Sequence, residues 1–226
     1  ISTLSSSSAA SDVYKRQIVT TGPTKEYIDP VRYISNESSG KQGYEIALEL
    51  SRLGIKTTLI SGPTKLKYDN EIKVKKVVTG KEMLEAVKRK LPTHIAVCAA
   101  AVSDFKPISS EKNKIKKNQI KEIKIEKNPD ILSFLGKNNR FKPKLLIGFS
   151  AETENLIKNS KIKMHEKFCD MMIANDVSKK DIGFDSDFNE ISVFTKESHT
   201  HFQKASKNLL AVQLINMLSK NNQSIH

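Results

Sequence analysis

Hydrophobic residues along the chain form short continuous runs that alternate with longer segments of helical periodicity. The run at 95–100 is apolar throughout, as expected of a strand buried on both faces of a sheet. Between such runs, apolar residues recur three and four positions apart, which is the spacing of an amphipathic helix. Strands are predicted at 18–21, 57–60, 74–78, 95–100, 145–149, 171–174 and 191–194, the last at a sheet edge. Helices are predicted at 42–53, 81–91, 129–135, 153–167 and 206–218.

This alternation predicts an α/β fold: a Rossmann-like, mainly parallel sheet with helices on both faces. Residues 1–17 are rich in serine and lack periodicity, so we interpret them as a disordered or non-native tail. The rest of the chain, 18–226, is then one domain. Within it, residues 106–127 hold eight lysines and three glutamates, and alternation around Ile123 and Ile125 predicts an exposed hairpin.

The charge of the chain narrows its possible partners. Among 226 residues, 38 Lys and Arg against 25 Asp and Glu give a formal net charge of +13. Such a charge favours nucleic acid, a membrane surface or phosphorylated small molecules, although a general lysine bias explains it equally well. No run approaches the roughly 18 apolar residues of a membrane-spanning helix. The two cysteines, Cys98 and Cys169, are too few for a disulfide framework or a zinc site, so a reduced, cytoplasmic protein is expected.

Five segments that directly follow predicted strands are rich in small, polar or charged residues. They span 22–43, 61–64, 101–117, 128–131 and 148–153. Ligands of open α/β sheets bind beyond the carboxyl ends of the strands, so a site is predicted where these loops meet. Residues 35–43 lead into a helix and would let backbone N–H groups approach an anion. They form neither a complete P-loop nor a complete dinucleotide fingerprint, and a simple helix cap remains an alternative.

Several side chains in these loops have more than one interpretation. Asp104 could bind Mg²⁺ together with nucleotide phosphates, or cap a turn. The lysines at 114–117 could close as a flap over a polyphosphate, or form a solvated face. Asp130 presents a carboxylate at a helix start, and Phe149, at the end of its predicted strand, could stack on a base or pack in the core.

Motifs in these loops resemble those of bacterial phosphopantothenoylcysteine synthetase (phosphopantothenate–cysteine ligase). They lie at 29–41, 100–105, 114–117, 128–131, 148–153 and 174–176, and the similarity runs in order from about 18 to 218. The resemblance implies a ligase that joins 4′-phosphopantothenate to L-cysteine in coenzyme A biosynthesis. CTP would activate the substrate carboxylate as an acyl-cytidylate with release of pyrophosphate, and cysteine would then displace CMP. Mg²⁺, a homodimer and an associated flavin-dependent decarboxylase domain or protein are also implied.

The resemblance also implies roles for particular residues. Asn36 would hold the acyl-cytidylate, Arg32 would support the same loop, and Lys114 would be the lysine of the flap. Asp104 would lie on the side of CTP and the metal. Further contacts to phosphopantothenate are implied for Ser38, Ser39, Gly40 and Ala100. Further contacts to the nucleotide are implied for Cys98, Ala99, Ala100, Lys114, Pro129, Asp130, Ile131, Leu132, Phe149, Lys163 and Lys167.

Two other classes of protein fit the sequence less well than the ligase. A nicotinamide-dependent oxidoreductase is disfavoured because Ser61 and Gly62 follow the second strand, where such enzymes need a carboxylate for the ribose. A basic nucleic-acid-binding module is disfavoured because the chain has no Trp and 6% aromatic residues, which is poor material for base stacking. We therefore expect a ligase with neither nucleic acid nor a membrane as partner.

Overall fold

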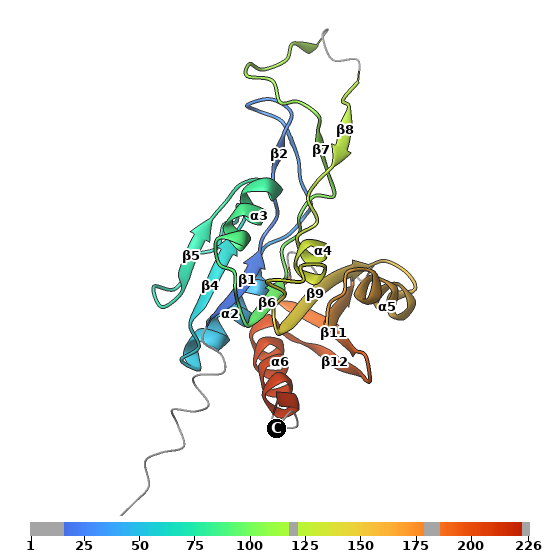
Figure 1. Ribbon diagram of the computed structural model, residues 1–226. Coiled ribbons are helices and arrows are strands. Elements are labelled where there is room, and N and C mark those ends of the chain that lie inside the picture. The colour runs from blue at the N-terminus through green and yellow to red at the C-terminus, as the bar shows by residue number, and fades with distance from the viewer. Residues whose placement is uncertain (1–15, 118–121, 179–185, 223–226) are drawn as a thin grey trace, which may run out of the picture.

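The computed structural model describes residues 16–117, 122–178 and 186–222, and its centre is one eight-stranded sheet (Figure 1). The strands are β1 (Gln17–Thr21), β4 (Thr57–Ser61), β5 (Lys73–Lys76), β6 (Ile95–Cys98), β9 (Leu145–Glu152), β10 (Met171–Asp176), β11 (Phe188–Thr195) and β12 (His199–Ser206). Their order is β12-β11-β10-β9-β6-β1-β4-β5. Neighbours from β10 to β5 are parallel, whereas β11 and β12 pair antiparallel. The prediction of a mainly parallel sheet is confirmed.

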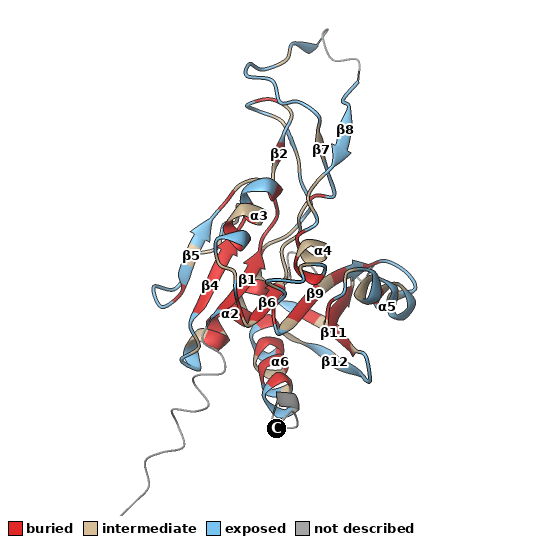
Figure 2. Cartoon of the chain, in the orientation of Figure 1, coloured by how far each residue is buried: buried red, intermediate tan, exposed pale blue. Residues whose placement is uncertain are grey.

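Helices cover both faces of the sheet, as predicted. Apolar residues of α2 (Lys41–Arg52) and α6 (Lys207–Asn222) pack on one face, together with Val19 and Leu59. Residues of α3 (Gly80–Lys88), α4 (Ile131–Gly136) and α5 (Leu156–Glu166) pack on the other face with Ile18 and Ile60. Successive strand residues point to opposite faces, so β1 and β4 contribute to both cores. The central strands are accordingly the most buried part of the molecule (Figure 2).

Several features of the strands differ from the prediction. The strand predicted at 191–194 is not an edge strand, because β11 pairs with β12 as well as with β10. We did not predict β12, whose polar sequence is largely exposed and gives no periodic signal. β9 continues to Glu152 because it pairs with β10 over its whole length, so Phe149 lies within the strand and not at its end. At the other terminus Gln17, assigned to the tail, is buried in β1, and residues 1–15 lie outside the described residues.

Two short antiparallel pairs extend beyond the sheet. β2 (Glu26–Tyr27) pairs with β3 (Tyr33–Ile34), and β7 (Phe105–Pro107) pairs with β8 (Ile125–Lys127). In Figure 1 these segments project away from the sheet at the top of the view, and we call residues 26–34, 105–117 and 122–127 the arm. The exposed hairpin predicted around Ile123 and Ile125 is confirmed for the described residues, which exclude 118–121.

Candidate functional site

A cavity of about 790 Å³ lies at the carboxyl ends of β1, β6, β9 and β10. Residues of four of the five predicted loops line it, whereas the loop at 61–64 lies behind it. That loop supports the wall, because Thr64 lies within contact distance of Gly22 and Gly40. The structure therefore has a cavity where the sequence predicted the site, at the carboxyl ends of the parallel strands.

The cavity brings together most of the predicted site residues. Those that line it are Asn36, Ser38, Ser39, Gly40, Cys98, Ala99, Ala100, Asp104, Pro129, Asp130, Ile131, Leu132, Phe149, Lys163 and Lys167. They come from six separate stretches of chain, so the fold alone assembles them. Desolvation by burial raises the pKa of the Cys98 thiol to about 12, and this group is neutral at physiological pH.

The loop before α2 is shaped by a close contact between helix and strand. Gly40 has φ of 75° and caps the helix, and the Thr21 hydroxyl donates to its carbonyl at 2.6 Å. A Cβ atom on Gly43 would lie 2.5 Å from the Thr21 Oγ1, so this glycine is required for packing. The hydroxyls of Ser38 and Ser39 accept hydrogen bonds from the backbone N–H groups of Gly40 and Lys41. The glycines therefore allow the helix to pack closely on the strand, and the N-terminus of α2 lines the cavity.

Hydrogen bonds connect the polar residues of the opposite wall. The Asn36 amide donates to the carbonyl of Val102 at 3.1 Å. The backbone N–H of Asn128 donates to the carbonyl of Asp104 at 2.8 Å, while Asp104 itself is exposed at the cavity. Asp130 caps α4 by accepting from the backbone N–H of Ser133 at 2.8 Å. Loops that are far apart in sequence are thus fixed to one another around the cavity.

Three lysines of the cavity, Lys41, Lys163 and Lys167, are paired with carboxylates. Lys163 donates at 2.8 Å to Glu152, which is only 7% exposed at the end of β9. Lys167 pairs with Asp130, and Lys41 pairs with Asp187. The hydrogen bond from Lys41, with its charge, holds the pKa of Asp187 below its ordinary value. An incoming phosphate would therefore exchange with carboxylates for these lysines.

Ser150 connects the central sheet to α5. It lies in β9 and is 5% exposed. Its hydroxyl lies 3.1 Å from the hydroxyl of Ser160 on α5, which is fully buried. This hydrogen bond satisfies both groups and attaches the helix that carries Lys163 and Lys167 to β9.

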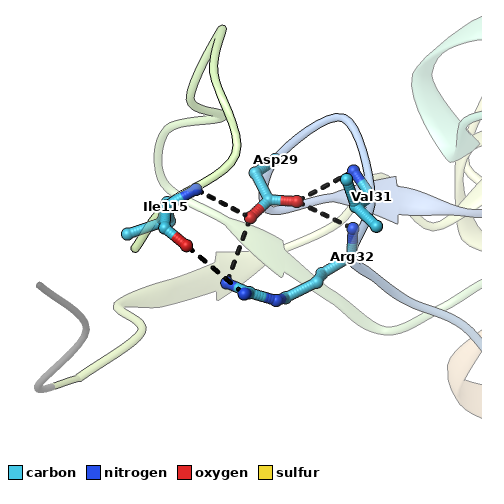
Figure 3. Close-up of polar contacts among 4 residues, drawn as sticks. All are labelled: Asp29, Val31, Arg32 and Ile115. Carbon is cyan, nitrogen blue, oxygen red and sulfur yellow. Dashed lines mark hydrogen bonds and ion pairs between the residues drawn. The ribbon is translucent and has the colours of Figure 1, made fainter. Parts of the chain in front are cut away.

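Two predicted residues, Arg32 and Lys114, lie on the arm and do not line the cavity. The Arg32 guanidinium donates to Asp29 at 3.2 Å and to the carbonyl of Ile115 at 3.3 Å (Figure 3). Arg32 therefore joins two segments of the arm, and its support of the Asn36 loop stays a prediction. Lys114 lines a separate groove of about 540 Å³ formed by the arm, together with residues such as Ile108 and Glu122.

Asp29 is the anchor of the arm and is completely buried. Its carboxylate accepts hydrogen bonds from the backbone N–H groups of Val31, Arg32 and Ile115 (Figure 3). Burial alone would raise the pKa of Asp29, but these hydrogen bonds and the Arg32 charge outweigh burial and lower it. The carboxylate therefore stays ionised and holds the segment around Ile115 against the β2–β3 hairpin.

Other residues that line the cavity were not predicted as site residues. They are Lys41, Gln42, Asn175, Asn189 and Lys207 among others. Asn175 belongs to the motif at 174–176, and its position near the end of a predicted strand could have identified it. Asn189 and Lys207 could not be found in this way, because their place depends on the pairing of β11 with the unpredicted β12.

Two further structural observations concern the residues that the structure describes. Among them, no three His, Cys, Asp or Glu side chains are grouped so that they could hold a metal ion. Over the same residues, we find no helix with the length and apolar character needed to cross a membrane.

The fold and the cavity define a Rossmann-like α/β protein whose candidate site lies beyond the carboxyl ends of parallel strands. Residues 13–221 match the family described as DNA/pantothenate metabolism flavoprotein C-terminal domain. The chain belongs to this family.

Named relatives agree with the family match. The chain is 38% identical over 210 residues to the coenzyme A biosynthesis bifunctional protein CoaBC of Vibrio cholerae, covering 91% of this chain and 52% of that protein. The CoaBC protein of Haemophilus influenzae is 40% identical over 200 residues, covering 88% and 50%. The chain thus spans about half the length of these relatives.

A solved structure matches the fold of the whole chain. The crystal structure of the C-terminal domain of a coenzyme A biosynthesis bifunctional protein CoaBC superimposes with a TM-score of 0.78 at 32% identity, covering 93% of this chain and 96% of that one. The resemblance inferred from the loop motifs is confirmed.

Proposed function

We propose that this chain is a phosphopantothenate–cysteine ligase of coenzyme A biosynthesis, using CTP and releasing CMP and pyrophosphate. The observation that carries the proposal is the single cavity in which Asn36, Asp104 and Lys163 meet at the carboxyl ends of parallel strands. Relatives named as coenzyme A biosynthesis proteins support it. We also propose a cytoplasmic location.

The proposed reaction has two steps. A carboxylate oxygen of 4′-phosphopantothenate attacks the α-phosphorus of CTP, the bond to pyrophosphate breaks, and an acyl-cytidylate forms. The neutral amine of L-cysteine then attacks the acyl carbon, the bond to CMP breaks, and the amine proton leaves to solvent. Because the amine needs no general base, catalysis depends on positioning and on stabilisation of charge.

The residues of the cavity divide between the two substrates in this proposal. The segment 129–132 and Phe149 contact the cytidine, and Lys163 and Lys167 exchange their carboxylates for phosphate oxygens. The loop at 38–40 and Ala100 contact phosphopantothenate, and the Asn36 amide holds the activated acyl group. In this proposal each substrate has its own set of contacts among the residues that line the cavity.

The residues present fit the Mg²⁺ that the resemblance implies. Asp104 and Asp130 both line the cavity, and Asp104 is exposed there. Mg²⁺ is usually bound by one or two carboxylates together with substrate phosphates, so a site made by protein groups alone is not required. When bound, Mg²⁺ would neutralise part of the charge on the triphosphate.

Partners also belong to the proposal. We propose a homodimer, because the arm exposes Val31, Ile108 and Ile125 by half or more of their surface, and a second copy would cover them. Closure of the arm would then bring Lys114 to the cavity of its own chain, and dimerisation would bring it to the cavity of the second copy. We further propose a flavin-dependent decarboxylase domain or protein that consumes the product.

Pyrophosphate release tests the proposed function. The protein is mixed with phosphopantothenate and either CTP or ATP, with and without cysteine. We expect release that requires phosphopantothenate and is faster with CTP. Release that proceeds equally without phosphopantothenate would contradict activation of the carboxylate. Faster release with ATP would refute the nucleotide assignment and leave the ligase reaction intact.

A further inference from the structure

Glu26 is a buried carboxylate that joins the start of α3 to a loop of the site without lining the cavity described above. It lies on β2 and is 4% exposed. Its Oε1 accepts hydrogen bonds from the backbone N–H of Gly80 and from the Nδ2 of Asn128, each at 2.8 Å. Hydrogen bonds to a carboxylate are stronger than those between neutral groups, so these contacts fix both partners firmly.

Asn128, which is held by Glu26, is hydrogen-bonded to residues that line the cavity. Its Nδ2 also donates to the carbonyl of Ser103 at 3.0 Å, and its backbone N–H donates to the carbonyl of Asp104 at 2.8 Å. With Nδ2 held between two acceptors, the side-chain amide has one orientation. Pro129 and Asp130 follow directly in the chain and line the cavity.

Gly80 contacts both Glu26 and Asn128 from the start of α3. It is the first residue of α3, and a Cβ atom at this position would lie 2.7 Å from the Nδ2 of Asn128. The helix therefore packs directly against the Asn128 amide, and Glu26 accepts from both. A disturbance of either partner should move Asn128.

We infer that Glu26 is a positioning residue for the nucleotide side of the cavity. Through Asn128 it sets the placement of Asp104 relative to Pro129 and Asp130. The inference rests on the proposed function, in which these residues contact the nucleotide and its Mg²⁺. Loss of Glu26 should therefore weaken nucleotide binding while cysteine capture by a preformed acyl-cytidylate is unchanged.

The test measures CTP binding with Mg²⁺ by calorimetry for Glu26→Ala and Glu26→Gln. Glu26→Ala should raise the Kd for CTP about 10- to 100-fold, as expected for loss of hydrogen bonds to a charged group. Glu26→Gln keeps an acceptor oxygen and should restore part of the affinity. In the ligase assay, the KM for CTP should rise and the KM for cysteine should not.

Glu82 supplies the matched control. It accepts from the backbone N–H of Val78 at 2.7 Å at the same helix terminus, but it is exposed and does not line the cavity. Glu82→Ala should disturb α3 and leave the Kd for CTP near the wild-type value. If it raises the Kd as much as Glu26→Ala does, Glu26 acts only through helix stability and the inference is wrong.

Gly80→Ala keeps the inference testable if Glu26→Ala does not fold. Alanine favours the helix, yet its methyl group should displace Asn128 and raise the Kd for CTP. An unchanged Kd in Gly80→Ala, or in folded Glu26→Ala, overturns the positioning role alone. Wild-type protein that binds no CTP overturns the proposed function and this role with it.

Discussion

The most buried ion pair of the cavity differs from the lysine pairs of the arm, although the pairs Lys41–Asp187 and Lys167–Asp130 at the cavity are partly exposed as well. In the cavity, Lys163 is paired with Glu152, a carboxylate that is 7% exposed and belongs to the central sheet. On the arm, Lys106 pairs with Glu126 at 3.0 Å and Lys124 with Glu122 at 3.5 Å, and all four side chains are substantially exposed. Exposed pairs contribute little to stability, typically about 0.2–1 kcal/mol. The cavity is thus a fixed binding surface, whereas the described arm depends chiefly on one buried carboxylate, Asp29.

This difference separates substrate binding from catalysis in the proposed ligase. Contacts that only bind the nucleotide can be built on strands and helices, where positions are set by the core. A lysine that must reach the α-phosphate after binding is better carried by a segment with few buried contacts, because such segments open at low cost. Lys114, exposed on the arm and outside the cavity, fits the second description.

Lys114→Gln gives the largest expected effect. Loss of one group that stabilises developing charge costs roughly 10²–10³ in rate, so most ligase activity should disappear. The melting temperature should stay near the wild-type value, because substitutions of exposed residues usually change stability by under about 0.5 kcal/mol. Steady-state kinetics and thermal denaturation check the two halves of the prediction.

Lys124→Gln is the control for this prediction, because Lys124 lines the same groove of the arm. Lys124→Gln should leave the ligase activity nearly unchanged. If both substitutions have the same small effect, the arm lysines form only a solvated face, and the contrast between cavity and arm has no catalytic meaning.

Asn36→Asp should have the next largest effect, this time within the cavity. The substitution removes the donor to the Val102 carbonyl and places a carboxylate oxygen near it. We expect the reaction of cysteine to slow by about 10² while the first step is less affected. Acyl-cytidylate should then accumulate and be detectable by mass spectrometry. A fully active variant, or a folded one that binds no CTP, would show that Asn36 has another role.

Gly43→Ala tests the rigidity of the cavity wall. The added methyl group would meet Thr21, so we expect a loss of about 1–3 kcal/mol in the free energy of unfolding. Intrinsic helix propensity predicts the opposite sign, a gain of up to about 1 kcal/mol. Urea denaturation decides between them, with Arg52→Ala on the exposed end of α2 as control. A stabilised Gly43→Ala protein would mean that α2 can move away from β1.

Acid should loosen the arm through Asp29, the smallest expected effect. The lowered pKa means that Asp29 stabilises the fold fully above the ordinary Asp pKa of about 3.9 and loses this contribution as pH falls through its own lower value. The rate of amide hydrogen exchange in the segment 105–117, relative to the intrinsic rate at the same pH, should therefore rise in strong acid. Asn at position 29 keeps one acceptor but loses the charge, so Asp29→Asn should show faster exchange already at neutral pH. Equal exchange rates in the wild-type and Asp29→Asn proteins would show that Asp29 does not anchor the arm.

The sequence predicts the sheet well where burial on both faces leaves a continuous apolar run, as in β6 and β10. It fails at β12, because an exposed edge strand needs no apolar pattern and is defined only by its partner β11. The loops of the site were predictable because parallel strands bring their carboxyl ends to one edge.

The predicted site residues show the same limit. Motif resemblance identifies Arg32 and Lys114 but not their place, since the contact of Arg32 with Ile115 joins residues 83 positions apart. Glu26 and Lys207 escape prediction for a related reason. Their importance follows from tertiary neighbours, which the sequence near them does not specify.

The neutral thiol of Cys98 has a consequence for redox chemistry in the cavity. The proposed substrate L-cysteine also carries a thiol, and only a thiolate exchanges readily with disulfides. With a pKa of about 12, Cys98 stays protonated at physiological pH. Oxidised cysteine that enters the cavity should therefore exchange only slowly with the Cys98 thiol.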